Sequence, residues 1–287
     1  SDGRQVIPTV YITNRVFEHL NDSLILKLAG KIQRRIDNHM DSWKGEVAWY
    51  VMPFTDNDGE DVSKRRDSLG NDWLLRCNEI QIDCDWTSAT RDRYFQFLRA
   101  MQAAVAPRKL SCTVRLHQYR DRAKAGIPPV DRGMLMCYNT ENPKELAVSN
   151  AIFDAALVKG YLKAPRYPLP LDVALPVFSW GAWFREEKFK GLLAGWDQTN
   201  ASNSGLYQAE GNYRYRVLQD TVLGHDYLRT GDLLRLDHAD EADLVEIAGL
   251  LAKKVRRPDS RLVFFDWQTE KIIRYEKVIQ TCAARFQ

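Results

Sequence analysis

Residues 79–87 read EIQIDCDWT, and the alternation of their side chains decides the expected fold. In an extended strand, successive side chains point to opposite faces, so the apolar positions 80, 82 and 84 share one face. Gln81, Asp83 and Asp85 share the other face. Strands buried in parallel sheets are normally hydrophobic throughout, and a buried charge is costly unless it is paired. Two carboxylates at the carboxyl end of such a strand therefore indicate a functional site.

Short apolar runs of the same kind recur along the chain and alternate with segments of helical periodicity. The predicted strands are residues 9–13, 46–53, 79–85, 110–118, 133–139, 172–180 and 261–267, with a weaker candidate at 231–239. The predicted amphipathic helices lie around residues 24–36, 94–105, 244–255 and 272–282. A strand followed by a helix, repeated from end to end, is typical of a parallel sheet covered by helices.

The fold expected from this pattern is a (β/α)8 barrel of the TIM type, regular or irregular. Seven or eight strands in 287 residues fit one such barrel, whose usual size is about 250 residues. A dinucleotide-binding open sheet would carry a Gly-rich turn after an early strand, and the sequence has none. We expect one barrel domain over residues 1–287, with an insertion or long loop at 186–238 before the last strand.

Composition and charge exclude several classes of protein. Lys and Arg total 41 against 38 Asp and Glu, so the formal charge is only +3. This charge does not indicate the excess of basic residues that is typical of proteins that bind nucleic acid. No apolar stretch approaches the roughly 20 residues of a transmembrane helix. The five cysteines show no C-x-x-C spacing, so we expect neither a disulfide framework nor a zinc site, and we interpret Cys84, Cys112 and Cys137 as small buried hydrophobes. No cofactor is predicted.

Polar and aromatic side chains lie at the carboxyl ends of the predicted strands, which form the functional face of a barrel. A site in which flat aromatic rings surround acidic side chains suits a ligand with apolar faces and many hydroxyls, such as a sugar. We predict Asp83 and Asp85 as the catalytic residues. The predicted substrate-binding residues are Arg115, His117, Tyr138, Asn139, Trp180, Trp183, Asp266 and Trp267.

Five segments together resemble the last five barrel strands of the family 18 glycoside hydrolases, the chitinase-like barrels. They read IQIDCDWT, LSCTVRLHQ, MLMCYN, LPVFSWGAW and VFFDW. The family's signature strand reads D-G-x-D-x-D-x-E, and a later strand reads M-x-Y-D. The layout resembles more closely a family of uncharacterised bacterial barrel proteins that share an I-D-x-D strand. The resemblance implies action on an oligo- or polysaccharide, and with the non-Met start it suggests a periplasmic or cell-surface protein whose export signal is removed.

The departures from the family 18 signature concern the catalytic acid. Asp83 and Asp85 match its second and third acids, whereas Thr87 stands where the family has its catalytic Glu, and Asn139 stands where it has Asp. Thr87 cannot protonate a glycosidic oxygen. Two hypotheses follow: a glycoside hydrolase that uses Asp83 and Asp85 as acid, base or nucleophile, and a non-catalytic barrel that binds glycans.

Two further interpretations stay open. A metal-dependent hydrolase would use Asp83, Asp85, His117 and His238 as ligands, although the sequence has no H-x-H or H-x-x-x-H motif. A structural role would pair Asp83 and Asp85 with Arg115 in a closed ion-pair network. The sequence leaves open the substrate, the oligomeric state and the compartment.

Overall fold

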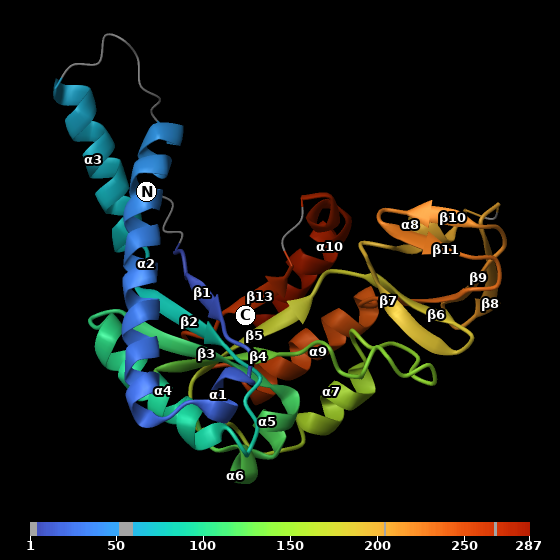
Figure 1. Cartoon of the computed structure of the whole chain (residues 1–287), viewed down its shortest axis with the longest axis horizontal. Helices are drawn as coiled ribbons and strands as arrows, with labels where there is room; N and C mark the ends of the chain where they lie inside the picture. The colour runs from blue at the N-terminus through green and yellow to red at the C-terminus, as the bar shows by residue number, and fades with distance from the viewer. Residues whose placement is uncertain (1–4, 52–59, 204, 267–268) are drawn as a thin grey trace. The chain divides into compact units, whose positions relative to one another are not determined.

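The computed structural model describes residues 5–51, 60–203, 205–266 and 269–287 of the chain (Figure 1). The chain divides into two compact units. One comprises Ser1–Val114, Asp121–Met134 and Pro168–Pro170, and the other comprises Arg115–Arg120, Leu135–Tyr167 and Leu171–Gln287. Of the helices in the described ranges, none has the length and apolar content that a bilayer crossing requires.

The first unit is built from parallel strands and the helices that cover them. Its strands are β1 (Thr9–Tyr11), β2 (Glu79–Asp83) and β3 (Lys109–Arg115), whose last residue belongs to the second unit. Its helices are α1 (Val16–His19), α2 (Asp22–Val51), α3 (Glu60–Leu75), α4 (Arg91–Val105) and α6 (Arg122–Ala125). Strand β2 pairs in parallel with both β1 and β3. The predicted apolar stripe of α4 is buried, and α2 packs against α4 and α3.

The second unit contains parallel strands, helices and an antiparallel sheet. Strand β4 (Arg132–Met136) divides between the units, and β5 (Leu171–Pro176) pairs in parallel with β13 (Leu262–Phe265). The helices are α5 (Leu116–Arg120), α7 (Ala155–Tyr161), α8 (Gln198–Ala201), α9 (Glu241–Lys254) and α10 (Thr269–Phe286). Helix α9 packs against α7 and α10 and buries the predicted stripe that includes Leu244, Ile247 and Leu251.

The antiparallel sheet has the strand order β7-β6-β12-β9-β8. Its strands are β6 (Trp180–Arg185), β7 (Lys188–Ala194), β8 (Tyr207–Gly211), β9 (Arg214–Val217) and β12 (Leu233–Asp237), and β10 (Thr221–Leu223) forms a hairpin with β11 (Asp226–Leu228). Its core includes Trp183, Trp196, Tyr207, Tyr215 and Leu234. The segment predicted as an insertion, 186–238, thus carries β7 to β12, while one domain over residues 1–287 stays a prediction.

The parallel sheet has six strands in the order β1-β2-β3-β4-β5-β13, which gives a mixed α/β fold compatible with a TIM-like one. The expected ring of eight strands is not formed by the described residues. Two predicted strands account for the difference. Residues 46–51 lie in α2, and residues 52 and 53 fall outside the described ranges. Residues 233–237 are a strand, but they pair in the antiparallel sheet. Short apolar runs do not distinguish a strand from a helix segment, which explains the first error.

Candidate functional site

Asp83 and Asp85 lie at the carboxyl end of β2 in the first unit. The predicted apolar face is confirmed, because Ile80, Ile82 and Cys84 are fully or almost fully buried. Asp83 is half-buried and accepts a hydrogen bond of 2.7 Å from Oγ1 of Thr113 in β3. Asp85 follows the strand and is exposed. The two carboxylates therefore have different environments, one held by a neighbouring strand and one in contact with water.

Arg115 and His117 belong to the second unit and to different elements. Arg115 ends β3, and its backbone N–H donates a hydrogen bond of 2.7 Å to Oε1 of Gln118. A helix begins at Leu116, so the predicted strand at 110–118 is wrong beyond Arg115. His117 is exposed and lies in that helix, so the expectation that it shares one face of a strand with Arg115 is wrong. Across the described ranges of the chain, no three His, Cys, Asp or Glu side chains gather as metal ligands.

Four aromatic rings gather at the carboxyl ends of β4, β5 and β13, and we call them the aromatic cluster: Tyr138, Phe178, Trp180 and Phe265. The Phe265 ring stacks on Tyr138 with 5.2 Å between centroids and 7° between planes. Phe178 meets both of these rings edge to face, and its centroid lies 5.4 Å from that of Trp180. Tyr138 and Phe178 are buried, but Phe265 is 47% exposed. The cluster thus presents an aromatic surface that is supported from below by two buried rings.

Asn139 follows Tyr138 and carries two energetic costs. Its backbone has a φ of 52°, in the left-handed region that glycine prefers. Its side-chain Oδ1 is buried and has no hydrogen-bond partner among the described residues. A buried acceptor without a donor costs about 1–3 kcal/mol, and such costs concentrate at functional positions. Asn139 is therefore a polar residue of this region whose structure is consistent with binding a ligand.

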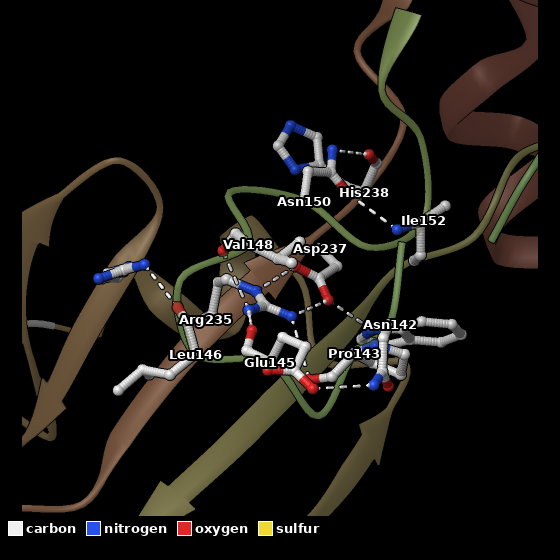
Figure 2. Close-up of polar contacts among 12 residues, drawn as sticks. Asn142, Pro143, Glu145, Leu146, Val148, Asn150, Ile152, Arg235, Asp237 and His238 are labelled. Carbon is white, nitrogen blue, oxygen red and sulfur yellow. Dashed lines mark hydrogen bonds and ion pairs between the residues drawn. The ribbon is translucent and has the colours of Figure 1, made fainter. Parts of the chain in front are cut away.

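A buried ion pair between Arg235 and Asp237 holds the loop that follows Asn139 (Figure 2). The same pair binds Trp180. The indole Nε1 of Trp180 donates to Oδ2 of Asp237 at 2.8 Å. Arg235 donates to both oxygens of Asp237, from Nε at 2.7 Å and from Nη2 at 3.0 Å, and both side chains are fully buried. The remaining donors of Arg235 bind the carbonyl oxygens of Pro143, Glu145 and Val148 at 2.7 to 3.2 Å.

Arg235 therefore uses all five of its N–H donors, which satisfies its desolvated charge. The loop that it binds continues the chain from Asn139, and Asn150 ties the same loop to the carbonyl oxygen of His238 (Figure 2). The sequence prediction missed Arg235 and Asp237. Their signal was present, because they alternate with apolar residues in LLRLD, as Asp83 and Asp85 do in β2.

Trp183, Asp266 and Trp267 are the remaining predicted site residues. Trp183 is buried in the core of the antiparallel sheet, where its Nε1 donates to Oδ2 of Asp232 at 2.8 Å. Asp266 follows Phe265 and is half-buried. Trp267 lies outside the described residues. A role in substrate binding stays a prediction for all three.

Comparisons with solved structures give a likeness of fold. No protein-family model and no curated protein sequence matches this chain. The fold is similar to the crystal structure of a chitinase from Chromobacterium violaceum ATCC 12472, with a TM-score of 0.44 and 13% identity over 78% of this chain and 73% of that chain. Identity at this level shows no shared activity, so the functional argument rests on the geometry of the site.

Proposed function

We propose that this protein binds a carbohydrate on the aromatic cluster of its second unit. The observation that carries the proposal is the Phe265 ring, which is 47% exposed although it stacks on the buried Tyr138. A large aromatic side chain normally buries most of its surface, and one that is fixed in place yet exposed offers a flat apolar face to a ligand. The apolar face of a sugar ring fits such a surface.

The polar groups near the cluster suit the hydroxyls of a sugar. Asn139 is the residue after Tyr138, and its unpartnered Oδ1 can accept a hydrogen bond from a hydroxyl. Trp180 is half-buried, and its ring orientation is fixed by the bond to Asp237. Ligand sites combine mostly apolar walls with a few polar groups that fix orientation, and this composition matches that pattern.

Titration calorimetry with a panel of oligosaccharides tests the proposal. We expect at least one member to bind. Phe265→Ala should weaken its affinity about tenfold or more, because the variant loses about one aromatic contact with the sugar. Tyr227→Ala is the matched control, because Tyr227 is 49% exposed in the β10–β11 hairpin and should leave affinity unchanged. Unchanged affinity in Phe265→Ala would refute binding at this cluster.

A second candidate function is glycoside hydrolysis by Asp83 and Asp85. It is supported by two carboxylates at the carboxyl end of β2, of which Asp83 is held by Thr113. Glycosidases use such carboxylates as acid, base or nucleophile. If the protein hydrolyses a member of the panel, Asp83→Asn and Asp85→Asn should each abolish product formation while binding persists. Binding without product over long incubation would leave the non-catalytic function alone.

A further inference from the structure

A groove of about 700 Å³ in the second unit belongs to no predicted site. It is lined by α9 between Ala242 and Lys254, by Lys159 of α7 with the two residues that follow that helix, and by Arg285 of α10, and we call it the α9 groove. The stretch from Ala242 to Lys254 is about 18 Å long at the usual helical rise. A groove of this length suits a chain-like ligand better than a single small molecule.

Unpaired cations dominate the charge of the α9 groove. Four of them are exposed and have no ion-pair partner among the described residues: Lys163, Lys253, Lys254 and Arg285. The Nζ of Lys159 lies 2.7 Å from Oε1 of Glu246, which is the one carboxylate among the described lining residues. The groove therefore carries four positive charges that nothing on its walls neutralises.

Helix polarity explains only part of this charge. Lys253 and Lys254 lie in the last turn of α9 and Arg285 lies in the last turn of α10, where a cation interacts favourably with the helix dipole. The carboxyl end of a helix carries about half of an elementary negative charge, so the ends of α7, α9 and α10 together offset fewer than two of the four cations. The excess that remains attracts an anionic partner.

Gly249 keeps the floor of the groove open. It lies in the interior of α9, where a glycine is less favourable than an alanine. Beyond the adjoining backbone of the helix, no atom lies within 4 Å of the Cβ that a substitution would add. The packing of the protein's own helices therefore does not require a glycine at this position. Without a Cβ, the backbone of α9 is accessible to a bound chain at close range.

The uncharged part of the lining is aliphatic. Leu162, Val245 and Leu250 contribute to it, and none of the described residues that line the groove is aromatic. Sites for single-stranded nucleic acid combine basic groups with aromatic rings on which the bases stack, and the flat apolar face of a sugar also favours an aromatic ring. A ligand that matches this lining carries carboxylates beside aliphatic groups, which is the chemistry of an acidic peptide.

We infer that the α9 groove binds a linear acidic segment of a partner protein. Its carboxylates interact with the four unpaired cations, and its aliphatic side chains contact Val245 and Leu250. An extended segment of about five residues covers the length of the groove. The inference goes beyond the proposed binding of carbohydrate and does not depend on it, because the groove and the aromatic cluster share no residue.

Fluorescence anisotropy with a labelled octapeptide of alternating Glu and Leu tests the inference on the full chain. We expect binding that weakens as the salt concentration rises, and much weaker binding of the octapeptide of alternating Gln and Leu. Gly249→Glu adds a carboxylate on the floor, where the open space accepts the side chain, and should weaken binding about tenfold or more. Gly30→Glu is the matched control, because it makes the same change of charge in α2 of the other unit, where the nearest atom to the added Cβ is 3.9 Å away.

Two further variants change the charge of the walls without filling the groove. Glu246→Gln releases Lys159 and removes a negative charge, so it should tighten binding of the acidic octapeptide severalfold. The double variant Lys253→Gln with Lys254→Gln removes two cations, so it should weaken binding and reduce its dependence on salt. These side chains are exposed, and their replacement should leave thermal unfolding unchanged.

The control variants and two other anions decide the outcome. Lower affinity in Gly249→Glu with unchanged affinity in Gly30→Glu supports the inference. No binding of the acidic octapeptide, or the same affinity in Gly249→Glu and Gly30→Glu, would overturn it. Tighter binding of oligothymidylate or of phosphatidylserine vesicles than of the octapeptide would also overturn it, because the groove would then recognise phosphate groups rather than an acidic peptide.

Discussion

The indole nitrogen of Trp180 lies 2.8 Å from a carboxylate oxygen of Asp237, and this bond joins a ring of the aromatic cluster to a fully buried ion pair. Asp237 also accepts two hydrogen bonds from Arg235, which in turn binds three carbonyl oxygens of the loop after Asn139. One buried pair thus fixes a candidate ligand-binding ring and the loop that carries a candidate polar contact.

Removing one member of this pair should destabilise the protein strongly. Arg235→Met leaves the Asp237 carboxylate buried with only the Trp180 donor, and we expect the free energy of unfolding to fall by about 3–5 kcal/mol. The double variant Arg235→Met with Asp237→Leu removes the orphaned charge and should be more stable than Arg235→Met alone. Urea unfolding of both variants checks this. A double variant as unstable as the single one would contradict the argument from burial of charge.

Asn139→Gly should separate function from stability. Glycine accepts the positive φ without strain and removes the unpartnered acceptor, so the unfolding free energy should stay constant or rise by up to about 1 kcal/mol. Sugar affinity should fall, because the carboxamide is lost. Asn139→Ala is the control, since alanine keeps the strain at positive φ and should be less stable than the glycine variant. A large loss of stability in Asn139→Gly would mean that the side chain is structural.

The five cysteines should be unreactive in the folded protein. All are free and buried, and burial raises the pKa of the Cys84 thiol to about 12 and that of Cys282 to about 11. The thiolate is the reactive form, so a thiol-specific reagent such as DTNB should modify the cysteines only after unfolding. Rapid modification of one cysteine under native conditions would show that its surroundings open readily.

His238 should make stability depend on pH on the acid side. Burial lowers its pKa in the folded state, while the Leu236 carbonyl, Asp240 and Asp237 act in the opposite direction and Arg274 acts with burial. The unfolded chain therefore binds the proton first, and stability is lost as pH falls from about 6.5 through the folded pKa. Thermal unfolding between pH 8 and pH 5 should show wild type losing stability relative to His238→Gln. A constant difference across this range would contradict the prediction.

Local periodicity predicted the parts of the fold that depend on neighbouring residues. The phase of β2 and the apolar stripes of α4 and α9 follow from spacing alone, and the structure confirms them. Residues 46–51 were assigned wrongly because an apolar run inside a long helix has the same composition as a strand. Strand spacing did not predict which sheet a strand would join, because β12 pairs in the antiparallel sheet, nor did it predict β7 to β11.

The candidate site depended on contacts far apart in the sequence. Arg235 and the Glu145 carbonyl are 90 residues apart, and no local pattern joins them. Tyr138 and Trp180 were predicted as site residues, but Phe265 was not. Which of several aromatic side chains at a strand end is exposed depends on how strands far apart in the sequence pack, and the sequence pattern does not show this. The alternation of polar and apolar side chains that identified Asp83 and Asp85 is also present at Arg235 and Asp237, which the sequence prediction missed.

The most direct test of carbohydrate binding is calorimetric titration of the wild-type protein and Phe265→Ala with the same oligosaccharide panel, with Tyr227→Ala as the control. Our account predicts saturable binding of at least one oligosaccharide by the wild-type protein and a loss of about tenfold or more in the affinity of Phe265→Ala. Equal affinity of wild type and Phe265→Ala, or no binding to any sugar, would contradict it.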